Sequence, residues 1–189
     1  MPNDAHEDGY DHNRIARGHN SRGGRPHERR GIPLSDLDRT TTDASRKVIG
    51  CAIEVHRRMG PGYEASLYAK ALKHELKAQE VKFVSDYRIP VMYKDELLGD
   101  VCAELLVQDL FLVHITARPG QVGTYERLEL RSQLKAANLD LGLIINFSER
   151  RLKDGLVRVL NIDKLKQTLP YAEDDLHDDG RISDFEVGR

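Results

Sequence analysis

Only a few residues of this chain have types and spacings that could carry chemistry. Cys51 and Cys102 lack the CxxC spacing of a zinc site, which favours reduced thiols and a cytoplasmic protein. The acidic run at residues 173–179 could hold a cation, but such a run is more typical of a solvated extension. His114 and Thr116 stand two residues apart in a stretch typical of a strand, so their side chains would share one face.

Residues 20–31 combine arginine with glycine, a composition that can bind the backbone of RNA or DNA. Acidic residues interrupt the arginines, so a solvated tail without a partner is the alternative interpretation. Residues 1–40 contain seven Arg and seven acidic residues but few apolar ones. We therefore expect residues 1–40 to form a disordered arm rich in Arg, Gly and His, because so little apolar surface cannot offset the entropy of ordering.

The charge is distributed unevenly over the 189 residues, although the formal net charge is only -2. Residues 41–170 hold 20 basic and 17 acidic residues, whereas residues 171–189 hold 2 basic and 7 acidic ones. This weak basic excess does not by itself identify a nucleic-acid-binding protein. No apolar run approaches the roughly 18 residues that span a bilayer. We expect one ordered domain over residues 41–165 and an acidic tail over residues 166–189, with no membrane association.

Apolar spacing predicts two helices at the start of the ordered domain. Residues 40–43 are rich in helix N-cap types, and the helical stripe that follows ends before Gly60. A second helix is expected over residues 64–79. Its inward-facing residues would be Leu67, Ala71, Leu72 and Leu76.

The apolar period then changes to that of β-strands. Strands are expected at residues 81–84, 87–93, 97–107, 110–116, 141–147 and about 156–160, with a helix over residues 124–138. Pro90 indicates an edge strand or a bulge. This order predicts an α/β fold in which helices flank one mixed sheet.

Five segments carry a resemblance to a known family: IEVH at 53–56, MGPG at 59–62, SLYAKAL at 66–72, NLDLGLIINF at 138–147 and RLKDG at 151–155. Through them, residues 48–161 resemble the GxxExxY family, a prokaryotic branch of the PD-(D/E)XK nuclease superfamily. The resemblance implies a nuclease-like core, here in the order α-α-β-β-β-α-β-β. It also implies a site in which carboxylates bind Mg²⁺ and a lysine assists phosphodiester cleavage.

The family's site positions are only partly retained in this chain. The Gly and Tyr of the motif match Gly62 and Tyr68, but its Glu falls on Ala65, with Glu64 one residue earlier. Glu64 could reach the site from the start of a helix, or could only stabilise the helix dipole. Glu104 stands where the family has a metal-binding Asp, and an ordinary solvent-facing strand residue is the alternative.

The next strand departs most from the family pattern. His114 replaces the second metal-binding carboxylate, Thr116 replaces the lysine, and Glu129 stands where relatives commonly carry Gln. A neutral threonine cannot supply positive charge to a phosphoryl transition state, although Arg118 or Lys135 could in principle replace it. The resemblance therefore predicts a largely degenerate site, with Glu104 and His114 as the candidate metal ligands.

Three functions remain open at this point. A catalytically silent nuclease-fold protein would bind DNA or RNA, or serve as a structural module, and would need no cofactor. An altered enzyme would bind Mg²⁺ or, because imidazole favours later metals, Mn²⁺ or a later transition metal. Its possible ligands are Glu64, Glu104, His114 and Glu129. An interaction or assembly protein would use its tails to contact a protein partner or a second copy of itself.

Overall fold

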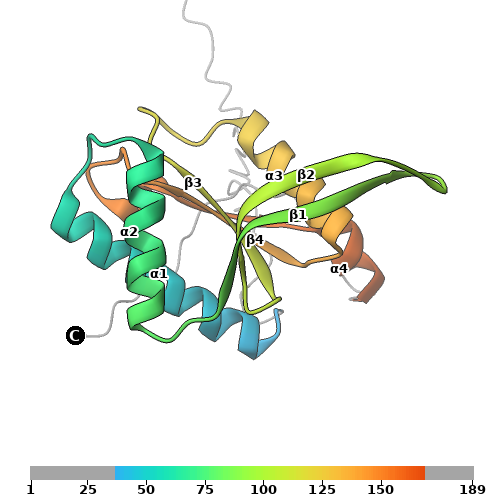
Figure 1. Ribbon diagram of the computed structural model, residues 1–189, viewed down its shortest axis with the longest axis horizontal. Helices are drawn as coiled ribbons and strands as arrows, with labels where there is room; N and C mark the ends of the chain where they lie inside the picture. Colours follow the sequence, from blue (N-terminus) through green and yellow to red (C-terminus); the bar gives the residue numbers. More distant parts are fainter. Residues whose placement is uncertain (1–36, 169–189) are drawn as a thin grey trace, which may run out of the picture.

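The computed structural model describes residues 37–168, which form a five-stranded sheet flanked by helices on both faces (Figure 1). The expected disordered arm falls outside the described residues up to residue 36, and the expected acidic tail falls outside them from residue 169. None of the described helices is long and apolar enough to cross a membrane.

Two helices cover one face of the sheet. Helix α1 spans Arg39–Met59 and α2 spans Ala65–Ala78. The carboxylate of Asp38 accepts a hydrogen bond from the Thr41 N–H at 3.3 Å and caps α1. The prediction of a cap at residues 40–43 was therefore wrong by a few residues, because the stronger acceptor Asp38 allows the helix to begin earlier.

The sheet has the order β1-β2-β3-β4-β5. The strands are β1 Phe83–Tyr93, β2 Glu96–Val107, β3 Phe111–Thr116, β4 Leu141–Asn146 and β5 Leu156–Leu160. All neighbours are antiparallel except β3 and β4, which are parallel and are connected through helix α3, Thr124–Ala137. The predicted mixed α/β sheet is confirmed.

Two apolar cores lie on the two faces of the sheet. One core packs α1 and α2 against alternate residues such as Leu105 and Val113, and the other packs α3 against Leu106 and Leu112. Strand β4 contributes to both cores and is buried along its whole length. This explains its uninterrupted apolar sequence.

Several elements differ from the sequence-based expectation. The two strands predicted at 81–84 and 87–93 form the single edge strand β1, which continues through Asp86 even though its φ is 54°. Pro90 lies on this edge strand, as predicted, next to a register shift. The sequence did not predict the 3-10 helix Leu152–Gly155 or helix α4, Ile162–Thr168. Leu67 is exposed rather than inward-facing.

Candidate functional site

Glu104 and His114 meet on neighbouring antiparallel strands. Leu105 of β2 pairs in register with Val113 of β3. Because the strands are antiparallel, Glu104, one residue earlier on β2, lies opposite His114, one residue later on β3. The two side chains are in contact, with 2.9 Å between His114 Nδ1 and Glu104 Oε2. The N–H of Ile115 donates a second hydrogen bond to the same oxygen at 3.1 Å. The expected convergence of these two residues on one face is therefore observed.

The carboxylate of Glu104 favours the protonated, positively charged form of His114. The hydrogen bond to Glu104 raises the pKa of His114 above its ordinary value of 6.5, against the opposite effect of burial. The pair is only partly shielded from water, since the side chain of His114 is 29% exposed and that of Glu104 is 39% exposed. The raised pKa therefore reflects a local ion pair rather than a deeply buried one.

Helix α3 adds acidic residues on the same side of the sheet. Glu126 and Glu129 both contribute electrostatically to the raised pKa of His114. Glu129 is exposed, whereas the carboxylate of Glu126 accepts a hydrogen bond from the Gly123 N–H at 2.5 Å and stabilises the start of α3. Glu129 therefore lies in the electrostatic neighbourhood of His114, and sequence reasoning missed Glu126, whose capping position was the available signal.

Glu64 occupies the N-cap position of α2, and the structure shows no contact between it and the Glu104–His114 pair. Its side chain is exposed and forms no capping hydrogen bond, while its backbone carbonyl accepts from Leu67 and Tyr68. Ala65 begins the helix. Among residues 37–168, no three His, Cys, Asp or Glu side chains gather as a metal-binding group.

Thr116 is buried at the end of β3 and is paired in register with Asn146 of β4. The Asn146 amide donates to the backbone carbonyls of Arg118 and Gly120, each at 2.9 Å. The hydroxyl of Ser148 also donates to the Arg118 carbonyl. These bonds fasten the loop after β3 to the loop after β4.

Four exposed basic residues follow the carboxyl ends of β3 and β4, which lie at the same edge of the sheet. We call this set the basic edge: Arg118, Arg150, Arg151 and Lys153, all of them exposed. Arg151 pairs with Asp154 at 2.8 Å. Lys135, the other cation considered from the sequence, lies in the last turn of α3 and forms an ion pair with Asp163 at 3.1 Å. Sequence reasoning missed the basic edge because its residues come from two segments that are far apart in the sequence.

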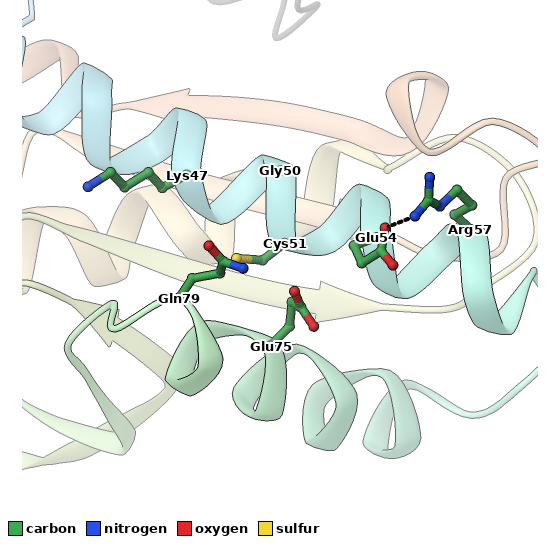
Figure 2. Close-up of a pocket in the computed structure, with 7 residues that line it drawn as sticks. All are labelled: Lys47, Gly50, Cys51, Glu54, Arg57, Glu75 and Gln79. Atoms are coloured by element: carbon green, nitrogen blue, oxygen red, sulfur yellow. Dashed lines mark ion pairs between the residues drawn. The ribbon is translucent and has the colours of Figure 1, made fainter.

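The chain also holds a polar groove of about 670 Å³ between α1 and α2 (Figure 2). Its lining residues are Lys47, Gly50, Cys51, Glu54, Arg57, Glu75 and Gln79. Glu54 is bound by Arg57 and by Arg58, and the thiol of Cys51 has a raised pKa because it is buried. None of the site residues predicted from the sequence lines this groove.

Comparison with known families agrees with the fold. The family model described as the PD-(D/E)XK nuclease superfamily matches residues 42–159, which is well over half of the chain. The chain therefore belongs to the PD-(D/E)XK nuclease superfamily. Comparisons with curated proteins and with solved structures give no significant match.

Proposed function

We propose that this protein is a GxxExxY-type member of the superfamily that binds nucleic acid and does not cleave it in Mg²⁺. The observation that carries the proposal is the direct contact between His114 and Glu104, 2.9 Å apart, at positions where the resemblance implies two metal-binding carboxylates. The remaining carboxylate is thus engaged by a side chain of the protein itself.

The residues present do not fit Mg²⁺. This ion prefers several hard oxygen ligands, but Oε2 of Glu104 already accepts hydrogen bonds from the imidazole of His114 and the N–H of Ile115. The imidazolium form of His114 adds a positive charge next to that oxygen and would repel a second cation. Thr116 is neutral and buried, so it supplies no positive charge for a phosphoryl transition state.

The basic edge supports nucleic-acid binding. Parallel strands end at the same border of a sheet. Here Arg118 follows β3, Arg150 and the 3-10-helix residue Lys153 follow β4, and hydrogen bonds join the two segments. Within the described part of the chain, these three cations have no ion-pair partner. Such residues can neutralise backbone phosphates without reading the base sequence.

The test is binding of labelled single-stranded DNA, double-stranded DNA and single-stranded RNA, followed by fluorescence anisotropy in EDTA at several salt concentrations. We expect binding without metal, and about tenfold or greater weakening in the double variant Arg118→Glu, Arg150→Glu. The salt slope should fall by about one per lost phosphate contact.

The matched control is Lys82→Glu. Lys82 is exposed, and its carbonyl accepts from Gln108 at the opposite end of the sheet, next to the turn between β2 and β3. This change alters the charge by the same amount per residue and should weaken binding much less. Absence of binding to all three probes, or an equal loss per charge in the control, would contradict the proposal.

A Mn²⁺-dependent phosphodiesterase acting through Glu104 and His114 is the alternative, because a neutral imidazole beside a carboxylate suits later divalent metals. Cleavage in Mn²⁺ that disappears in His114→Gln would favour this alternative. The hypothesis that the protein acts through its tails concerns residues outside the described part of the chain.

A further inference from the structure

The distal part of the β1–β2 hairpin is exposed to an unusual degree. We define the hairpin tip as residues 91–101. From Glu96 to Cys102 every residue of β2 is exposed, and the hairpin projects well beyond the rest of the fold (Figure 1). Burial on β2 begins only at Ala103.

Large apolar side chains gather on this exposed tip. Met92, Tyr93, Leu97 and Leu98 are between 54% and 62% exposed, and Val101 is 36% exposed. At these exposures, five side chains of this size present on the order of 500 Å² of apolar surface over the two faces of the ribbon, with Met92 and Tyr93 on opposite faces. A two-stranded ribbon uncovered in this way is also only marginally stable in water.

We propose that the hairpin tip is a self-association surface, on which the tips of two copies of this chain pack against each other. A twofold contact uses the same tip twice, so two tips that interlock over both faces would bury up to about 1,000 Å² of apolar area before any polar rim is counted. This total approaches the lower limit of specific interfaces, whereas the patch alone does not.

The charges on the tip favour a second copy over nucleic acid. The tip carries one basic residue, Lys94, and three acidic ones, Asp95, Glu96 and Asp100. A net negative surface repels phosphate, but Lys94 of one copy can pair with an acidic residue of the other copy. Pro90 and the positive φ of Asp86 interrupt the free edge of β1, so the contact uses the faces of the tips rather than added strand pairing.

The experiment is sedimentation velocity of the full chain over about 1 μM to 1 mM, a range suited to an interface near the lower size limit. We expect a concentration-dependent dimer. The double variant Leu97→Lys, Leu98→Lys should weaken association by about 100-fold or more, because two apolar contacts are replaced by like charges in a symmetric interface. Both leucines are exposed in the monomer, so its folding should persist, as checked by circular dichroism.

The matched control is Leu128→Lys, which changes a leucine on α3 that is 51% exposed and lies outside the tip. This variant should dimerise like the wild type. A wild type that stays monomeric at every concentration would overturn the proposal. A dimer that survives the double variant, or that Leu128→Lys weakens equally, would overturn it as well by placing the interface elsewhere.

Discussion

Three ring side chains, His56, Tyr68 and Phe147, form a cluster that we call the aromatic joint. The aromatic joint and the Glu104–His114 pair differ in how tightly their surroundings constrain them. The rings of Tyr68 and Phe147 are stacked 4.5 Å apart, both residues are fully buried, and His56 Nε2 lies 2.8 Å from the carbonyl of Glu149. The joint ties α1 and α2 to the end of β4.

The Glu104–His114 pair is partly exposed and joined mainly by one charged contact. The two regions therefore differ in how strongly a substitution would disturb packing. Tyr68, the residue that resembles the tyrosine of the GxxExxY motif, lies in a fully buried stack, where a change would cost packing energy. His114 stands where the resemblance implies a carboxylate, and its partly exposed surroundings can accommodate a different side chain. A substitution at the pair is therefore expected to cost less packing energy than one at the aromatic joint.

The largest predicted effect is on the aromatic joint. Phe147→Ala should lower the free energy of unfolding by about 3–5 kcal/mol, because it removes a fully buried ring that packs on Tyr68. Urea denaturation measures this change. Tyr125→Ala is the control, since that ring is 77% exposed and its loss should cost within about 0.5 kcal/mol. Equal effects of the two variants would contradict the assignment of the joint to the core.

A smaller loss of stability is predicted for Tyr68→Phe. The Tyr68 hydroxyl donates to the Gly60 carbonyl at 2.5 Å and accepts from the Tyr63 N–H at 3.2 Å, so its removal leaves two backbone groups without this partner. We expect a cost of about 1–3 kcal/mol in the same denaturation assay. Tyr63→Phe, at a half-exposed ring, is the control and should be nearly neutral. A neutral Tyr68→Phe would mean that water replaces both hydrogen bonds.

The smallest effect is predicted at the Glu104–His114 pair. Because Glu104 raises the pKa of His114, the pair contributes full stability below about pH 6.5 and loses it as the pH rises through the raised pKa. The contribution should be about 1 kcal/mol or less, since both side chains are partly exposed. Glu104→Gln should shift the His114 titration midpoint to lower pH, as followed by NMR of the imidazole protons.

The control for this titration is Glu129→Gln. Glu129 acts on His114 only through longer-range electrostatics, so its removal should lower the midpoint less than removal of Glu104 does. An unchanged midpoint in Glu104→Gln would show that the hydrogen bond between Glu104 and His114 does not set the charge of the imidazole.

The fold could be predicted from the sequence where the apolar period was clear. The continuous apolar run in β4 identified that strand, because burial on two faces leaves few polar positions, and the turn residues Gln108 and Asp109 marked the start of β3. Two strands were predicted where the structure has the single strand β1. Ser85 and Asp86 are residue types typical of turns, and Asp86 adopts a positive φ within the strand. The prediction that Leu67 faces inward was wrong, because Tyr68, one residue later, occupies the core instead.

The site could be predicted only where two residues share one hairpin. Glu104 and His114 are close in sequence, so the turn between β2 and β3 is enough to place their side chains in contact. The basic edge needs the parallel pairing of β3 with β4, a contact across a helical crossover that residue spacing does not encode. The position of Glu64 depends on how α2 docks, which is also a tertiary property.

The most direct test of the central claim is cleavage of DNA and RNA by the purified full chain in Mg²⁺, with and without EDTA. We predict no Mg²⁺-dependent cleavage by the wild type, because Thr116 and His114 stand where the resemblance implies a lysine and a metal-binding carboxylate. Loss of one stabilising group from a phosphoryl transition state costs about 10²–10³ in rate. The variant His114→Glu, Thr116→Lys, with Ala65→Glu added, should gain cleavage if its fold persists by circular dichroism. Cleavage by the wild type in Mg²⁺ that is abolished in Glu104→Ala would contradict the account.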